Sequence, residues 1–281
     1  MKLSVIKLIT WIVLLNIPFS LSAKEVLTWR VIDWPPFYIL DGADKGQGLY
    51  DQLIKKIADA LPEYQHRTMV MNTKRVLAEL ENGSHVCHPS ALGDTIGVLS
   101  KTNSLLLPYR IIYDTEDKPE FAQYESIALA AILQDKNYHI GIASDRYSST
   151  LNNILAKHEG ENNLINQNNY NSLIRMFFSK RIDALIEYPP VINYSKRLLD
   201  NTISNSSIAI QELSASEFLP VYFACPNNEW GKAVIEKINA FLVNESLTED
   251  YLAYRLRWYD EESQKLLKRF YQKNYLLDKR N

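Results

Sequence analysis

The hydrophobic residues of this chain follow two patterns, one typical of strands and one typical of helices, and a strand pattern is followed by a helix pattern near the N-terminus. Residues 26–32 form a short apolar run that predicts a buried strand. Further along, Leu49, Leu53, Ile57 and Leu61 recur at the spacing of one helix face. A strand followed by an amphipathic helix is a building unit of α/β folds, so we expect that class.

An aromatic and proline-rich turn lies between this strand and this helix. Pro35 and Pro36 carry no amide proton, so pairing in the sheet must stop there. We expect Trp34, Phe37 and Tyr38 to lie on an exposed loop as the chain leaves the sheet. Ligands bind at the strand-end crevices of such sheets, which makes this turn a candidate site.

The same patterns predict further elements, with turns between them. Expected strands are 66–71, 85–89, 139–143 and 221–224; expected helices are 74–80, 127–133, 147–156, 172–180 and 230–243; two more helices follow. An Asn-rich stretch at 161–171 is interpreted as a loop with one short strand. Residues 110–122 are charged and rich in turn-forming residues, and we interpret them as a crossing between two halves of the protein.

The N-terminus has the parts of a secretory signal peptide. Lys2 and Lys7 give a positive end, residues 8–15 are apolar, and the small residues Ser22 and Ala23 follow. The apolar segment is too short to span a bilayer comfortably. We expect cleavage after Ser22 or Ala23 and export to the periplasm; an uncleaved membrane anchor is the alternative.

Composition excludes several classes of function. Loss of Lys2 and Lys7 leaves 29 basic residues against 33 acidic ones, a net charge of −4. That balance provides neither a footprint for nucleic acid nor a polybasic membrane patch. The nine glycines form no dinucleotide-binding or P-loop pattern, and no Gly-x-Ser-x-Gly elbow is present. We predict no cofactor and no catalytic residue.

One cluster has residue types that bind metals. On a strand, His85 and Cys87 face one side and His88 the other, so the three cannot bind one ion, and we predict no metal site. The sequence holds two cysteines, Cys87 and Cys225. In an oxidising compartment they can form a disulfide, and burial as two thiols is the alternative.

Three stretches resemble the bacterial extracellular solute-binding proteins of family 3. The first is Trp34 with Pro36 and Phe37, followed by Asp-Gly, a later glycine and an amphipathic helix. The second is the turn after the third strand, with Ser90, Thr95 and a later Pro-Tyr pair. The third and most specific is Arg-Ile-Asp-Ala at 181–184, ahead of an apolar strand.

The resemblance implies a fold and a function. It implies a two-lobed type II periplasmic-binding-protein fold, α/β in class, with each lobe a sheet flanked by helices and two hinge crossings between them. After a signal peptide at 1–23, lobe one would contain 24–113 and 219–281, and lobe two 114–218. A monomer of this kind would capture a small polar solute in the interlobe cleft for an ABC permease or a membrane sensor. An enzyme on the same scaffold and an interaction module with a collapsed cleft are the alternatives.

The resemblance also bears on individual residues. Trp34 takes the place of the family's ligand-stacking aromatic, with Tyr38 beside it, and Ser90 fits the turn after the third strand. The return strand would lie beside that third strand, which would place Cys225 near Cys87.

Two further groups of candidates concern charge. Arg146 and Tyr147 stand where a helix is expected to begin, a position that favours anionic groups. Glu187 or Tyr188 takes the place of an aspartate that holds a ligand amine in the family.

One departure from the family concerns the ligand's carboxylate. The family's carboxylate-binding arginine is Val98 here. Burying a carboxylate without a donor would cost several kcal/mol. Either the ligand lacks that group, which we favour on the sequence, or Arg110 or Arg146 supplies the charge.

Overall fold

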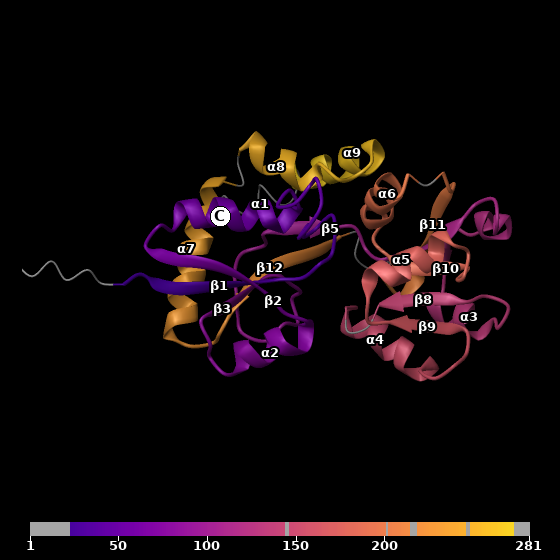
Figure 1. Cartoon of the computed structure of the whole chain (residues 1–281), viewed down its shortest axis with the longest axis horizontal. Coiled ribbons are helices and arrows are strands. Elements are labelled where there is room, and N and C mark those ends of the chain that lie inside the picture. The colour runs from indigo at the N-terminus through magenta and orange to yellow at the C-terminus, as the bar shows by residue number, and fades with distance from the viewer. Residues whose placement is uncertain (1–22, 144–145, 201, 214–217, 246–247, 273–281) are drawn as a thin grey trace, which may run out of the picture.

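The computed structural model describes residues 23–143, 146–200, 202–213, 218–245 and 248–272. The expected signal peptide lies outside these residues, apart from Ala23 at its end. Two sheets, each flanked by helices, lie side by side (Figure 1). None of the described helices has the length and apolar character needed to cross a membrane. Each expected strand and helix overlaps an observed one, because the patterns that predicted them are local.

The first sheet joins strands from both ends of the chain. Its order is β2-β1-β3-β12-β4, and β5 pairs with β12. Strand β1 runs parallel to β2 and β3, whereas β12 runs antiparallel to β3. The strands are β1 (Glu25–Val31), β2 (Tyr64–Val70), β3 (Val86–Ala91), β4 (Val98–Leu99), β5 (Ser104–Leu106) and β12 (Leu219–Cys225); the helices with them are α1 (Leu49–Ala60), α2 (Thr73–Glu81) and α7 (Glu229–Glu245).

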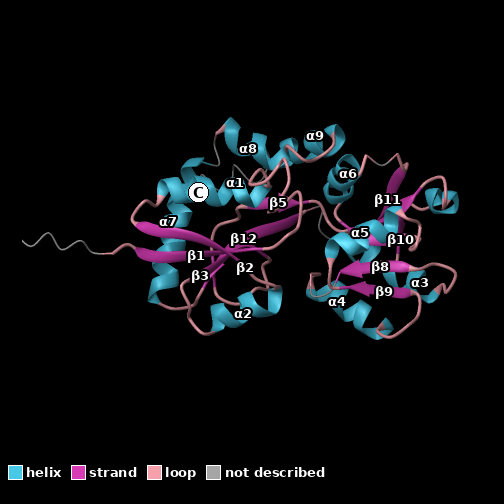
Figure 2. Ribbon diagram, in the orientation of Figure 1, coloured by secondary structure: helices cyan, strands magenta, loops and turns pink. Residues whose placement is uncertain are grey.

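The second sheet is built from the middle of the chain. Its order is β7-β11-β6-β10-β8-β9, with β6 antiparallel to β10 and β11. Figure 2 shows β8, β9, β10 and β11 of this sheet with the helices beside them. The strands are β6 (Arg110–Asp114), β7 (Ser126–Ile127), β8 (Ile140–Ala143), β9 (Leu164–Gln167), β10 (Ala184–Glu187) and β11 (Asn205–Ile210). The helices are α3 (Leu129–Gln134), α4 (Ser149–Leu155), α5 (Tyr170–Phe178) and α6 (Pro189–Leu198).

The chain passes between the sheets earlier than the sequence indicated. Strand β6 pairs in the second sheet, so the first crossing lies at residues 107–109 and the boundary expected after residue 113 falls inside a strand. Of the stretch that suggested a crossing, residues 110–114 form β6 itself and residues 115–122 follow its end. We refer below to residues 23–106 and 219–272 as lobe one and to residues 110–210 as lobe two.

The proline-rich turn is buried, which corrects the expectation of an exposed loop. Trp34 is 9% exposed, Phe37 1% and Tyr38 0%. The turn folds back on itself, because the Trp34 and Tyr38 backbones exchange hydrogen bonds, and α1 then packs over it. Asp51 in the first turn of α1 accepts hydrogen bonds from the backbone amides of Ile39 and Gly48, at 2.8 and 3.1 Å. That carboxylate therefore fixes the loop to the helix start.

The C-terminal helices α8 (Glu249–Leu256) and α9 (Glu261–Phe270) extend over lobe one (Figure 1). The Tyr251 hydroxyl donates a hydrogen bond to the Asn103 carbonyl, and the Tyr271 hydroxyl accepts one from the Leu105 amide at 2.8 Å. Both rings are buried, so the extension is part of the core of lobe one.

The same extension also reaches lobe two. The Trp258 ring packs edge-on against Tyr194 of α6, with centroids 5.0 Å apart. Arg197, also on α6, lies over the Trp258 ring and pairs with Asp44 of lobe one at 2.6 Å. Lobe two is thus held against lobe one on a surface separate from the two crossings.

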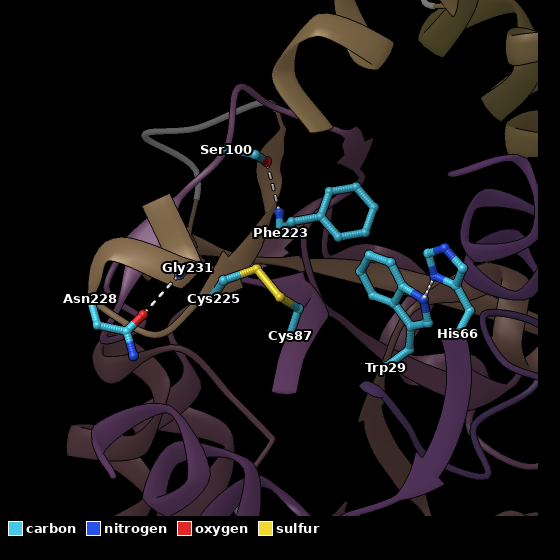
Figure 3. Close-up of a disulfide and its surroundings, with 8 residues drawn as sticks. All are labelled: Trp29, His66, Cys87, Ser100, Phe223, Cys225, Asn228 and Gly231. Atoms are coloured by element: carbon cyan, nitrogen blue, oxygen red, sulfur yellow. Dashed lines mark hydrogen bonds between the residues drawn. A yellow bond between two sulfur atoms is a disulfide. The ribbon is translucent and has the colours of Figure 1, made fainter. Parts of the chain in front are cut away.

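A disulfide joins the two chain segments that make up lobe one. Cys87 on β3 and Cys225 on β12 are bonded, with their Cα atoms 4.4 Å apart, and both are fully buried (Figure 3). The sequence left a bridge and two buried thiols open, and the structure has the bridge. It closes a sequence separation of 138 residues that contains all of lobe two, so it fixes the strand that returns from there.

Removing this bridge should lower the free energy of unfolding. We expect Cys87→Ala/Cys225→Ala to lose about 2–5 kcal/mol, because the unfolded chain regains the entropy of a long open loop. Urea unfolding followed by tryptophan fluorescence measures the difference. Wild type treated with a reductant should approach the variant, and the variant itself should not respond to reductant. Equal midpoints for wild type and variant would contradict this.

Candidate functional site

A cavity of about 380 Å³ lies between the lobes, at the carboxyl ends of β1 and β3. Aromatic rings form much of its wall: Trp34 and Tyr50 from lobe one, Tyr147 and Tyr188 from lobe two, and Tyr109 from the crossing. A volume of this size and such a lining are typical of small-molecule sites. We call this cavity the cleft.

Lobe one contributes the polar floor of the cleft from two neighbouring strands. Arg30 on β1 is 4% exposed; its Nε donates to the Met71 carbonyl at 3.1 Å and its Nη1 to Ser90 Oγ at 3.4 Å. Ser90 on β3 also accepts from the Tyr38 hydroxyl at 2.9 Å. His88 accepts from the Ser90 amide through Nδ1 at 3.2 Å. These hydrogen bonds hold the Arg30 side chain in one place.

Lobe two contributes a buried ion pair. Arg146 Nη2 lies 3.3 Å from Glu187 Oε2, and the side chains are 12% and 1% exposed. The guanidinium lies between two rings, 4.3 Å from the Trp34 centroid and 4.7 Å from the Tyr170 centroid. Burial raises the pKa of Glu187, and the charge of Arg146 opposes that rise. Glu187 Oε1 also accepts a hydrogen bond from the Tyr188 amide at 2.8 Å.

Aromatic contacts join the two lobes at the cleft. Tyr188 stacks on Tyr109 with ring centroids 3.8 Å apart, and it lies 5.8 Å from Trp34 and 5.7 Å from Phe37. Burial raises the pKa of Tyr109 to about 12, so its phenol is neutral near pH 7. The rings therefore offer stacking faces and neutral hydroxyl groups.

Five of the residues nominated from the sequence line the cleft: Trp34, Ser90, Arg146, Tyr147 and Tyr188. Tyr147 is fixed there, because its hydroxyl donates to the Ile186 carbonyl and accepts from the Ala143 amide, each at 3.0 Å. The helix expected to begin at residue 147 begins at Ser149, so Arg146 precedes it and pairs with a carboxylate instead.

The other three nominated residues lie elsewhere. Tyr38 and Glu187 are fully buried behind the wall, where they support Ser90 and Arg146. Arg110 faces a different cavity, of about 630 Å³, and donates from Nε to Ser207 Oγ at 2.7 Å. Tyr109, which precedes β6 in the crossing, lines both cavities, whereas Arg110 lines only the second.

Sequence reasoning missed Arg30, which is the most deeply buried cation of the cleft floor. Its signal was present, because a single arginine within an otherwise apolar strand is unusual for a buried segment. The expectation from the sequence about the ligand's carboxylate relied on Val98. That residue pairs with Cys225 at the edge of the first sheet and does not line the cleft. Among the described residues, no group of three or more His, Cys, Asp or Glu is arranged to hold a metal ion.

No protein-family model matches this sequence, and no curated protein matches it significantly. Solved structures do match the fold. One, described as an ancestral arginine-binding protein bound to arginine, has a TM-score of 0.63 at 15% identity and covers 85% of this chain and 99% of its own. A histidine kinase sensor domain with similarity to periplasmic binding proteins has 0.60 at 13%, covering 84% and 96%.

A third match is the substrate-binding protein of an amino acid ABC transporter, with a TM-score of 0.59 at 14% identity, covering 83% of this chain and 98% of its own. At such identities the likeness establishes the fold alone. The chain has the type II periplasmic-binding-protein fold, as the resemblance implied.

His88 should make stability depend on pH. Burial lowers its pKa well below the ordinary value, and the charge of Arg30 lowers it further. The folded protein therefore keeps His88 neutral while the unfolded chain takes up a proton below about pH 6.5. This contribution to stability is complete above about pH 6.5 and falls with decreasing pH by up to about 1.4 kcal/mol per unit. Urea unfolding at a series of pH values should show that the free energy of unfolding falls less steeply with decreasing pH in His88→Asn than in wild type. Parallel pH dependences for the two proteins would contradict this role of His88.

The Arg146–Glu187 pair should behave as a unit. Glu187→Gln leaves a buried guanidinium without its counter-charge and should cost about 3–5 kcal/mol of unfolding free energy. Adding Arg146→Met should restore part of that loss, because no buried charge then remains in the pair. A double-mutant cycle in urea measures this coupling. Additive losses would show that the two side chains do not interact.

Proposed function

We propose that this protein captures a small solute in the cleft between its lobes and presents it to a membrane partner, either an importer or a sensor. The observation that carries the proposal is the composition of the cleft wall, which takes side chains from both lobes. A ligand that touches both lobes stabilises their closed arrangement through its differential contacts, and no chemical step is needed.

The chemistry of the wall suits recognition. The Tyr147 hydroxyl forms hydrogen bonds with two backbone groups, and Ser90 accepts two hydrogen bonds. Glu187 forms an ion pair with Arg146. Side chains fixed in this way provide a preformed surface, which lowers the entropy lost on binding.

The cellular setting rests on two features. The buried disulfide suits an oxidising compartment outside the cytoplasm. The solved structures with this fold include a transporter's binding protein and a kinase sensor domain, so the fold serves both transport and sensing. We propose the periplasm as the location and leave the choice of partner to experiment.

A thermal-shift screen of the mature protein against small metabolites tests the proposal. A solute at about 100 times its dissociation constant should add about 2.7 kcal/mol of stability. Trp34→Ala and Tyr188→Ala should weaken the response by removing one wall of the cleft from each lobe. Tyr124→Ala is the matched control, because that ring is 41% exposed and lies outside the cleft.

The same screen separates the alternatives. A binding protein releases its solute unchanged after denaturation, whereas an enzyme on this scaffold returns a product. If no solute raises the unfolding temperature, the proposal fails and the interaction module with a collapsed cleft becomes the better explanation.

A further inference from the structure

The charged residues in and around the cleft differ in whether another charge of the protein already neutralises them. Glu187 is fully buried and paired with Arg146, so each of these two charges is already balanced by the other. Lys74 and Asp94 also line the cleft, but both are exposed at its rim, where water screens them. The charge that remains is that of Arg30.

Arg30 is a buried cation whose neighbours do not neutralise it. Its hydrogen-bond partners are the Met71 carbonyl and the hydroxyls of Ser90 and Tyr38, and no described carboxylate forms an ion pair with it. Burial lowers the pKa of Arg30, Tyr38 opposes that shift, and the like charge of Arg146 lowers the pKa further. A guanidinium does not lose its proton in proteins, and a buried charge without a partner is costly. An anion that enters the cleft would relieve this cost.

Two further donors point to the same kind of ligand. Trp34 Nε1 and Arg146 Nη1 are buried and have no hydrogen-bond partner among the described residues. Both side chains line the cleft, and the guanidinium lies directly over the indole ring. Buried donors without acceptors are unfavourable, so a ligand oxygen that reaches them adds to binding.

A ligand ammonium group would meet the opposite situation. The carboxylate that could hold it, Glu187, is buried behind the wall and paired with Arg146, and two guanidinium groups line the cleft. Binding an amine here would require breaking a buried ion pair, which is strongly unfavourable.

We propose that the cleft selects small monocarboxylates that lack an amino group, with Arg30 and Ser90 holding the carboxylate and the aromatic wall holding an apolar or aromatic body. This rests on the proposed function and names the class of its solute. A single unneutralised guanidinium matches a singly charged anion better than a phosphate dianion. The sequence favoured a solute without a carboxylate, because Val98 takes the place of the family's carboxylate-binding arginine; this proposal assigns that role to Arg30 instead.

Calorimetry with matched compounds on the mature wild-type protein tests this inference. The panel runs from acetate through butyrate to 3-phenylpropionate, and each carboxylate is accompanied by its 2-amino derivative and its primary amide. We expect at least one carboxylate to bind, and to bind about tenfold or more tightly than its amino and amide counterparts. Tighter binding of the amino acid or the amide overturns the inference, as does the absence of binding by every carboxylate in the panel.

The failure of this inference and that of the proposed function remain distinguishable. Binding of some other solute in the metabolite screen, with no carboxylate of the panel bound, rejects the ligand class and keeps the binding function. Absence of any ligand-linked stabilisation rejects both.

Variants at Arg30 separate recognition from folding. In Arg30→Gln the preference for the carboxylate over its amide should fall by about 10- to 100-fold, as expected for loss of a charge-assisted hydrogen bond. Arg30→Lys should keep part of this preference for the carboxylate. The readout is the ratio of carboxylate affinity to amide affinity within one variant, so a general loss of stability does not change it. Arg67→Gln is the control, since Arg67 is exposed on the neighbouring strand β2, outside the cleft. An unchanged ratio in Arg30→Gln overturns the role of Arg30.

Discussion

The buried ion pair between Arg146 and Glu187 is the constraint on which the cleft depends. Both charges are out of water, so each needs the other, and the pair fixes what the lobe-two wall can offer. It holds the Arg146 guanidinium against the Trp34 ring of lobe one, and it balances the charge of the buried Glu187 carboxylate. The backbone hydrogen bond from Tyr188 to Glu187 also links the pair to the aromatic contacts that join the lobes.

The polar floor of lobe one depends on strand order. Arg30 and Ser90 can meet because β1 and β3 are neighbours, with Trp29 opposite Cys87 in the register just before them. Cys87 is in turn bonded to Cys225 on β12, the strand that returns from lobe two. The covalent link therefore lies on the same strand, β3, that presents His88 and Ser90 to the cleft. A displacement of the return strand would be transmitted to His88 and Ser90, which line the cleft.

The sequence predicted what local patterns determine. Strand and helix positions followed from apolar spacing, and the resemblance supplied the two-lobed fold and the neighbourhood of Cys87 and Cys225. It did not predict that β6 belongs to the second sheet, because the pairing of β6 with β10 and β11 involves residues distant in sequence. It placed Trp34 on an exposed loop, although the burial of that ring depends on Arg146 and Tyr188 from the other lobe. Five nominated residues line the cleft, but the pairing of Arg146 with Glu187 could not be read from either residue alone.

The number of charged residues around the cleft does not by itself determine the electrostatic field inside it. Lys74 and Asp94 are exposed, so solvent screens their effect on a bound solute. Arg146 and Glu187 are buried, but each balances the charge of the other. Arg30 alone combines burial with the lack of an opposite charge, and its field acts in a medium that screens poorly. In the family that the sequence resembles, an arginine follows the third strand and a carboxylate remains free for an amine. In this protein Glu187 is paired with Arg146 within the fold, and we propose that Arg30 on β1 provides the cation. Under this proposal, the same fold would select a different class of ligand according to which charge remains unpaired after folding.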